Sequence, residues 1–305
     1  ARMYNCRQYA MELQEVTIVW TTAIASTFYC YGVKTVVAKR TTRLMFLLPV
    51  VCLFLYLPLR IHSIHFCGTA ALCIAWLANC KLLLLAFNKG PLCSLPLPSF
   101  VAVALLPVDL PDPKFETRAR EGPLTNTVKL LVPLFLVQAY AYADSIPPQL
   151  IPIIYLIHIY ALLEGVLLIW RLLGRLILGL ELQPQFKEPY LSTSLQDFWG
   201  RRWNLTVSRC LRPIVYEPIL GFSARYVGRR MATFAAVIAT FTFSGLTHEL
   251  WFAYLTRTTP SFELTCYFIV HGALLVLEIA VKRRFGEKLV IPSWLSRVMT
   301  VTFVL

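Results

Sequence analysis

The feature that most constrains this chain is a series of long apolar runs, each almost free of charge. An α-helix needs about 20 mainly apolar residues to cross the hydrocarbon core of a bilayer, and runs near that length recur along the whole sequence. Only 15% of the 305 residues are charged, whereas soluble globular chains carry about 25%. The sequence therefore predicts an all-α, polytopic membrane bundle.

The individual runs predict about eight spans with additional interfacial helices. The spans are expected at residues 16–33, 44–59, 69–87, 128–143, 150–170, 231–254 and 262–281, with a last run beginning near Trp294. Residues 99–108 are too short to cross and are expected to be interfacial or re-entrant. No repeat of the kind found in transporters is visible. One lipid-embedded domain over residues 1–305 is expected, and its longest hydrophilic stretch is residues 171–230.

The net charge of +13 comes from 29 Lys and Arg against 16 Asp and Glu. Nucleic-acid binding is set aside, because the basic residues form short clusters between apolar runs, as cytosolic loops of membrane proteins do. A basic cytosolic face also attracts anionic headgroups and phosphate-bearing substrates. Arg2 and Arg7 fall on the opposite side. The clusters assigned to the cytosol are Lys34, Lys39, Arg40 and Arg43; Lys114, Arg118 and Arg120; Arg171 to Arg230; and Lys282, Arg283, Arg284 and Lys288.

The nine cysteines predict neither a metal site nor a disulfide framework. No two have C-x-x-C spacing, and most lie in apolar runs, where a reduced cysteine acts as a small hydrophobic residue. A cleaved signal peptide is not evident either, since Glu12 and Glu15 stand at the start of the first apolar run.

His248 and Glu249 interrupt a run that carries no charge from Met231 to Thr247. On a helix, His248 shares a face with Ser244 and Gly245, two small residues that leave room beside the imidazole. Away from water the neutral imidazole is favoured, and this form accepts a proton from a hydroxyl. His248 is therefore a candidate general base; the alternative is a structural histidine. Glu249 points about 100° away and either shares a partner with the imidazole or pairs with a basic residue.

A second polar segment, residues 196–204, combines aromatic, basic and amide side chains. If residues 203–212 are helical, Asn204 lies at the border of an apolar stripe, where its amide could hold a thioester carbonyl or an alcohol. Two alternatives remain, a plain helix-border asparagine and a glycosylation sequon, which a cytosolic location would leave unused. Arg201 and Arg202 either grip phosphates or set topology. Asp197 is expected to pair with Arg201 at i, i+4.

Other ionisable residues lie within the predicted spans. His271 and Glu278 share one helix face and could support a neighbouring polar site. His158 and Glu164 do not share a face. Glu164 is expected to have a partner such as Arg171, two turns further along the helix.

Several sequence motifs together resemble the plant wax synthases, which are long-chain-alcohol O-fatty-acyltransferases of the membrane-bound O-acyltransferase superfamily. The resemblance covers nearly the whole chain, and the most specific block is Gln196-Asp197-Phe198-Trp199-Gly200-Arg201-Arg202-Trp203-Asn204. The other matching segments are residues 76–79, 81–84, 90–92, 180–186, 189–191 and 212–218, and Ser244-Gly245 with His248-Glu249.

The resemblance implies an acyl-CoA-dependent acyltransferase of the endoplasmic reticulum, with an internal reaction chamber and no separate cofactor. Its substrates would be acyl-CoA and a hydrophobic alcohol that arrives through membrane lipid. His248 matches the family's essential histidine, and Asn204 the asparagine that ends its Trp-Asn motif. Arg201 and Arg202 would bind acyl-CoA. The supporting residues would be Glu249, Gln196, Asp197, Trp199, Trp203, Ser244 and His271.

In the reaction expected from this resemblance, His248 takes the hydroxyl proton of a long-chain fatty alcohol while the oxygen attacks the thioester. A sterol, triterpenol or diacylglycerol acceptor remains open. A covalent acyl-cysteine is disfavoured, because no cysteine neighbours His248 or Asn204 in sequence. The rival class is a proton-coupled transporter that uses His248, Glu249 and Glu164 as a relay. Relatives usually continue with a further span, so a truncated C-terminus is expected.

Overall fold

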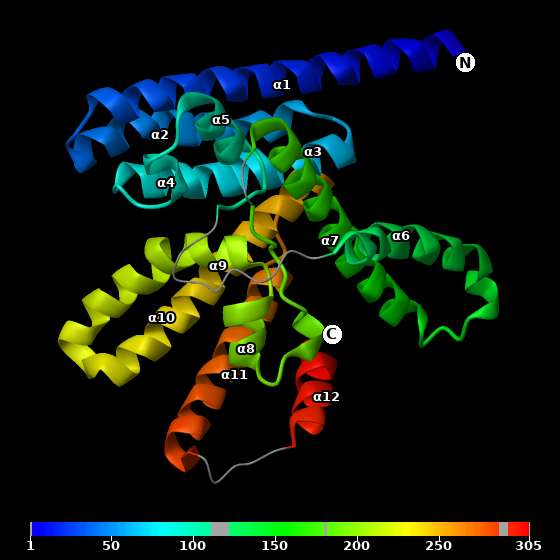
Figure 1. Cartoon of the computed structure of the whole chain (residues 1–305), viewed down its shortest axis with the longest axis vertical. Coiled ribbons are helices and arrows are strands. Elements are labelled where there is room, and N and C mark those ends of the chain that lie inside the picture. Colours follow the sequence, from blue (N-terminus) through cyan, green and yellow to red (C-terminus); the bar gives the residue numbers. More distant parts are fainter. Residues whose placement is uncertain (1, 111–121, 180–181, 287–291, 305) are drawn as a thin grey trace. The chain divides into compact units, whose positions relative to one another are not determined.

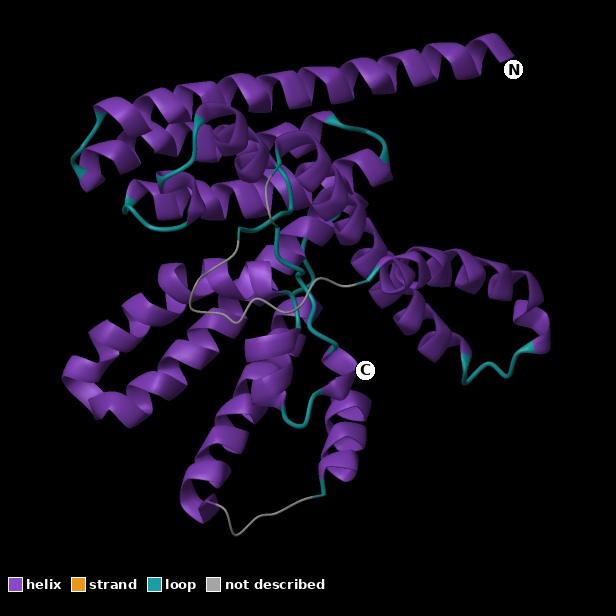
Figure 2. Cartoon of the chain, in the orientation of Figure 1, coloured by secondary structure: helices purple, strands orange, loops and turns teal. Residues whose placement is uncertain are grey.

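The computed structural model describes residues 2–110, 122–179, 182–286 and 292–304. Every regular element in these ranges is helical (Figure 2), which confirms the prediction of an all-α chain. Some residues of the sequence analysis lie outside the described ranges: Leu180 and Glu181 of the motif, and Lys114, Arg118, Arg120 and Lys288 of the basic clusters.

Six described segments are long and apolar enough to cross a membrane, so the chain is a polytopic membrane protein. They are Ala10–Val36, Arg40–Arg60, Ile64–Ala86, Ile151–Leu178, Leu205–Thr256 and Glu263–Phe285. The two remaining predicted spans correspond to shorter helices, α6 (Pro123–Ala139) and α12 (Ser293–Val304). The run at 99–108 folds as α5 (Leu97–Leu105), nine residues long, which is too short to span as expected.

The chain folds into two compact units, and each is described by itself. The first comprises Ala1–Pro107 and Val207–Lys288, and the second comprises Val108–Thr206 and Leu289–Leu305.

The first unit begins with α1 (Arg2–Val36) and α2 (Arg40–Tyr56), which lie side by side (Figure 1), followed by η1 (Leu57–Arg60). The next three elements form one continuous helix: α3 (Ile64–Ala70), the π-helix η2 (Ala71–Ala78) and α4 (Asn79–Ala86). This helix is almost entirely buried, because it is apolar on every side and packs against α2, α5 and α10. A short turn, η3 (Pro91–Cys93), leads to α5.

Two buried cations fix helix ends in this unit. The Lys81 ammonium donates to the carbonyl oxygens of Val103 at 2.6 Å and Leu106 at 2.8 Å, at the end of α5. The Arg43 guanidinium donates to the oxygens of Val37 at 2.7 Å and Leu85 at 3.1 Å, at the ends of α1 and α4. The last carbonyls of a helix have no partner within it, so Arg43 has a structural role besides any effect on topology.

The remainder of the first unit is built from α9 (Leu205–Leu211), which starts in the second unit, then η7 (Arg212–Tyr216), α10 (Glu217–Thr256) and α11 (Glu263–Phe285). The backbone of α10 is broken at Gly228, whose φ of 74° is left-handed, and the helix turns back there (Figure 1). The second arm of α10 and α11 form a tightly packed hairpin. The predicted spans at 231–254 and 262–281 are therefore confirmed as helices.

The second unit contains the hairpin of α6 and α7 (Ile151–Leu178), joined through η4 (Tyr140–Ser145). Residues 182–188 are irregular and lead to three short elements, η5 (Pro189–Leu191), α8 (Leu195–Asp197) and the π-helix η6 (Phe198–Arg202). Helix α12 contacts η5. The motif block 196–204 therefore lies on the end of α8, on η6 and on two residues outside any helix.

Candidate active site

The His248 imidazole is held in one orientation by the helix that carries it. Its Nδ1 lies 2.7 Å from the carbonyl oxygen of Ser244, one turn earlier on α10. A carbonyl oxygen only accepts, so Nδ1 carries the hydrogen and donates it. In neutral imidazole the lone pair is then on Nε2. His248 is thus prepared to accept a proton at Nε2.

Two aromatic rings clamp this imidazole from neighbouring elements. Phe268 of α11 stacks on it, with ring centroids 4.4 Å apart and an interplanar angle of 28°. Trp76 of η2 meets it edge-on at 4.8 Å and 74°. Trp76 belongs to a motif segment to which the sequence analysis gave no role, and Phe268 has no distinguishing sequence signal in an apolar helix. Three elements therefore converge on His248.

The space expected beside Gly245 is filled by α11. A Cβ atom added to Gly245 would lie 2.8 Å from the Cα of Thr265 and 3.2 Å from the Cβ of Phe268. The expectation that these small residues leave an open gap was therefore wrong at Gly245. The glycine instead lets the two backbones approach, and this approach brings Phe268 onto the imidazole.

Glu249 is buried on the same hairpin, with 5% of its surface exposed. Within the described residues, its Oε1 has no hydrogen-bond partner, and neither has Oγ1 of the buried Thr265. Buried polar atoms are nearly always satisfied, so these two atoms can take a hydrogen bond from a substrate hydroxyl or from water. Among the described residues no hydrogen bond joins Glu249 to His248, so the expectation that the two side chains share a partner stays a prediction.

The polar residues of α11 divide into two kinds. His271 is 3% exposed and lies against the ring of Tyr267, at 4.3 Å between centroids. Glu278 forms an i, i+4 ion pair with Lys282 at 2.8 Å, on a partly exposed face. His271 therefore remains a candidate supporting residue, whereas Glu278 is accounted for by its surface pair.

In the second unit, Asn204 lies at a bend rather than within a helix. The predicted helix over 203–212 begins only at Leu205, and Asn204 has a φ of 38°. Asparagine is one of the few residues other than glycine that adopt left-handed backbone angles readily. Asn204 is half-buried, so its amide is held at a corner of the chain and not along a helix face.

An aromatic cluster surrounds the residue before this corner. Trp203 stacks on Phe198 at 5.2 Å and on Tyr160 at 6.0 Å. Phe186 and Trp199 meet it edge-on at 5.0 and 6.4 Å. Two of the predicted supporting residues, Trp199 and Trp203, thus pack together beside Asn204, while Gln196 is exposed.

Asp197 pairs with Arg202 and not with Arg201 as expected. The Arg202 Nε lies 2.7 Å from Asp197 Oδ2, and Arg201 is exposed. The reason is that η6 is a π-helix, closed by a hydrogen bond from the Trp203 N–H to the Phe198 oxygen at 2.9 Å. A π-turn is closed by an i→i+5 hydrogen bond and holds one residue more than an α-turn, which rotates residue i+5 toward the side of residue i.

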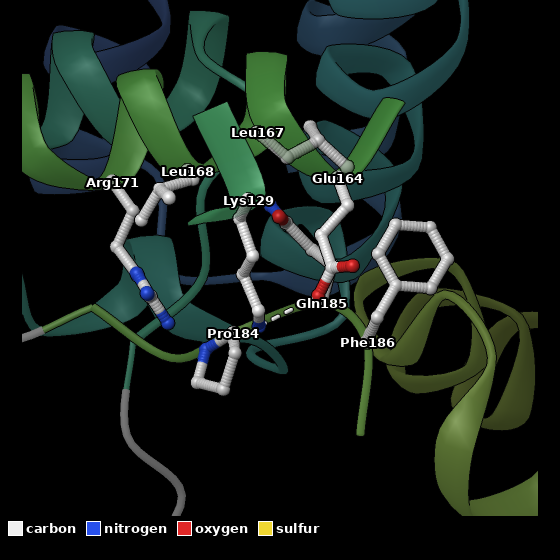
Figure 3. Close-up of a pocket in the computed structure, with 8 residues that line it drawn as sticks. All are labelled: Lys129, Glu164, Leu167, Leu168, Arg171, Pro184, Gln185 and Phe186. Carbon is white, nitrogen blue, oxygen red and sulfur yellow. Dashed lines mark ion pairs between the residues drawn. The ribbon is translucent and has the colours of Figure 1, made fainter. Parts of the chain in front are cut away.

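A hollow lined by α6, α7 and residues 184–186 contains an ion pair (Figure 3). The Lys129 ammonium lies 2.7 Å from Glu164 Oε1, so the partner that the structure gives to Glu164 is Lys129 rather than the expected Arg171. Arg171 lines the same hollow, next to Pro184 and Gln185 of the motif segment. The side chain of His158 contacts the Tyr140 hydroxyl at 2.7 Å.

Each unit thus gathers part of the predicted site. The first unit brings together His248, Ser244, Trp76 and Phe268, with Glu249 and His271 on the same hairpin. The second brings together Asp197, Trp199, Arg202 and Trp203 beside Asn204. Among the described residues, no group of three or more His, Cys, Asp or Glu side chains could hold a metal ion.

Comparison with known proteins places both parts in one family. Residues 182–270, which include Asn204 and His248, match the model of the "membrane bound O-acyl transferase family". The chain is 43% identical to a probable long-chain-alcohol O-fatty-acyltransferase 1 of Arabidopsis thaliana, over 87% of this chain and 80% of that protein. The chain belongs to the membrane-bound O-acyltransferase family.

Further relatives in the family carry two kinds of names. The long-chain-alcohol O-fatty-acyltransferase of Simmondsia chinensis is 40% identical over 96% of this chain and 87% of its own length. An acyl-CoA–sterol O-acyltransferase 1 of Arabidopsis thaliana is also 40% identical, over 94% of this chain and 86% of its length. The resemblance to wax synthases is therefore confirmed, and the protein is a membrane-embedded acyltransferase of the wax synthase type.

Proposed function

We propose that this acyltransferase moves the acyl group of acyl-CoA onto the hydroxyl of a long-chain fatty alcohol, giving a wax ester and CoA. The observation that carries the proposal is the fixed tautomer of His248, whose Nδ1 is bound to the Ser244 oxygen at 2.7 Å while Nε2 keeps its lone pair. The names of the relatives at 40–43% identity support the choice of substrates.

In the proposed reaction, Nε2 of His248 accepts the hydroxyl proton as the alcohol oxygen forms a bond to the thioester carbonyl carbon. The tetrahedral intermediate then collapses, the carbon–sulfur bond breaks, and the CoA sulfur takes the proton back from the imidazolium. No covalent acyl-enzyme is needed. Phe268 and Trp76 keep the ring in place between turnovers. A base that is already held in position lowers the entropic cost of reaching the transition state.

The remaining roles follow the residue types. The Asn204 amide donates a hydrogen bond to the thioester oxygen as it becomes negatively charged. Glu249 holds the acceptor hydroxyl through its unpartnered Oε1. Ser244 and His271 support His248, and Trp199, Trp203, Gln196 and Asp197 support Asn204. The exposed Arg201 attracts the CoA phosphates.

We further propose the setting of the reaction. The protein is a single catalytic bundle of about eight spans with an internal chamber, and it lies in the endoplasmic reticulum membrane. The segment 171–230 faces the cytosol, because its basic residues accord with the positive-inside rule. Acyl-CoA then enters from the cytosol, and the alcohol enters laterally from lipid.

One observation favours a second acceptor class. The sterol acyltransferase of Arabidopsis matches this chain at an identity close to that of the wax synthases. A sterol or triterpenol would react through the same hydroxyl chemistry, as would diacylglycerol. Membership of an acyltransferase family argues against the transporter alternative.

The test is an acceptor panel. Purified protein in lipid nanodiscs is incubated with radiolabelled acyl-CoA and, in separate reactions, a long-chain fatty alcohol, a sterol, a triterpenol and diacylglycerol, and labelled esters are separated by chromatography. We expect the fatty alcohol to give the highest kcat/KM. A higher value for the sterol would transfer the proposal to that acceptor. No ester with any acceptor would overturn the proposal.

A further inference from the structure

The guanidinium of Arg202 is already engaged by the protein itself. Its Nε lies 2.7 Å from Asp197 Oδ2. One terminal nitrogen donates to the carbonyl oxygens of Lys187 at 3.2 Å and Glu188 at 3.3 Å. The side chain is 22% exposed and that of Asp197 is 18% exposed. Several donors of the arginine fork are therefore used within the fold, and the carboxylate neutralises the charge.

These contacts join two segments of the motif, residues 185–188 and residues 202–205. Two backbone hydrogen bonds run parallel to them: the Lys187 N–H donates to the Arg202 oxygen at 2.9 Å, and the Leu205 N–H donates to the Gln185 oxygen at 2.8 Å. Residues 185–188 are thus fastened to residues 202–205. Asn204 lies between the two fastened points.

These hydrogen bonds hold two residues at backbone angles that an unconstrained chain rarely adopts. Asn204 has a φ of 38° and Glu188 a φ of 47°, both in the left-handed region. Such angles cost about 1–2 kcal/mol for a residue with a Cβ atom, and they persist only where the surroundings impose them. The Arg202 guanidinium donates to the Glu188 oxygen. The backbone oxygen of Arg202, two residues before Asn204, accepts a hydrogen bond from the Lys187 N–H.

The π-helical turn is what makes this clamp possible. Because η6 closes from residue 198 to residue 203, Asp197 and Arg202 share a face five residues apart. The backbone of Asp197 is held as well, because its N–H donates a hydrogen bond to the Ser194 hydroxyl oxygen at 3.1 Å. In a regular α-helical turn Arg202 would lie about 140° around the helix from Asp197 and could not pair with it.

We propose that Arg202 is a positioning residue that, through Asp197 and the Lys187 and Glu188 carbonyls, fixes the Asn204 corner for acyl transfer rather than binding the phosphates of acyl-CoA. The inference rests on the proposed role of Asn204 in the reaction. A phosphate-binding arginine would set the affinity for acyl-CoA, whereas a positioning arginine sets the rate of the bound complex.

The experiment compares Arg202→Gln, Arg202→Lys, Asp197→Asn and the Arg202→Gln/Asp197→Asn double variant with the wild-type protein. Arg297→Gln is the matched control, because Arg297 is an exposed arginine of α12 in the same unit. Two quantities are measured in nanodiscs: kcat for ester formation per binding-competent molecule, and Kd for a non-reactive thioether analogue of acyl-CoA. Counting only molecules that bind the analogue removes the effect of unfolded protein.

Positioning predicts that kcat falls about 10- to 100-fold in Arg202→Gln and in Asp197→Asn, with Kd changed by less than about 2-fold. Because the two residues act as one clamp, the double variant should be no slower than the slower single variant. Arg202→Lys should recover part of the rate at most, since an ammonium cannot reproduce the fork. Arg297→Gln should match the wild type.

A weaker Kd in Arg202→Gln, by about 10-fold or more, together with wild-type behaviour of Asp197→Asn, would show a phosphate contact and overturn the inference. Unchanged kcat in all Arg202 and Asp197 variants would also overturn it. Should Arg202→Gln fail to fold, Asp197→Asn and Arg202→Lys carry the same comparison. If the wild type itself forms no ester, the proposed function fails and takes this inference with it; an active wild type with unaltered variants refutes this inference alone.

Discussion

At position 204 one residue meets two separate demands. Its backbone takes a φ of 38°, which asparagine tolerates better than most residues, and its amide can donate to a developing oxyanion. Sequence reasoning identified the amide but placed it on a helix border, because apolar periodicity carries no information about left-handed angles. The two demands can be separated by substitution.

Replacing Asn204 with glycine should keep the fold and lose the chemistry. Glycine adopts a left-handed φ without cost, so the unfolding temperature of Asn204→Gly in detergent should stay near the wild-type value. Asn204→Ala should be less stable by about 1 kcal/mol. Ester formation should fall about 100-fold or more in both variants if the amide stabilises the oxyanion. Full activity in Asn204→Gly would show that only the backbone of this residue matters.

At the scale of elements, close helix approach determines the surroundings of His248. Periodicity alone predicted helices over 231–254 and 262–281, and the structure has them. It did not predict that Gly245 brings the α11 backbone against α10, or that Phe268 then stacks on the imidazole. Similarly, a repeat of 3.6 residues predicts the pair Asp197–Arg201, and only the π-turn selects Arg202.

Gly245→Ala should force the two helices apart. The new Cβ would lie 2.8 Å from a backbone atom of Thr265, so we expect a loss of about 1–3 kcal/mol in unfolding free energy and slower ester formation as Phe268 moves off the imidazole. Gly221→Ala is the matched control, on the first arm of α10: among the described residues outside its own helical turn, no atom lies within 4 Å of its Cβ position. This variant should be neutral or slightly stabilising. Equal behaviour of the two variants in thermal unfolding would contradict the packing account.

At the scale of the whole molecule, the apolar runs predicted most of the helices, because lipid requires long uncharged segments. Six described segments meet the length and hydropathy of a span, whereas α6, with 17 residues, and α12, with 12, are shorter than those six segments. The hydropathy pattern does not predict contacts between segments that are distant in sequence. The pair of Lys129 with Glu164 and the capping by Lys81 and Arg43 are examples, since each depends on how helices pack.

The proposed orientation predicts which loops are accessible from the cytosol. Single cysteines at Lys187 and at Thr259, both exposed, are introduced into a background in which the exposed Cys52 and Cys266 and the half-buried Cys93 are replaced by serine. The variants are treated with a membrane-impermeant maleimide in sealed microsomes. Burial raises the pKa of the Cys93 thiol and slows its labelling, and the serine removes that background. We expect position 187 to react at once and position 259 only after permeabilisation. The reverse order would contradict the assignment of 171–230 to the cytosol.

The central claim is that Nε2 of His248 removes the proton from the acceptor alcohol, and turnover of His248→Ala tests it most directly. The matched control is His65→Ala, which deletes an exposed imidazole on α3. With acyl-CoA binding verified for each protein, kcat for ester formation should fall about 100- to 10,000-fold in His248→Ala and stay at the wild-type value in His65→Ala. Near-wild-type turnover by a His248→Ala protein that still binds acyl-CoA would contradict the claim.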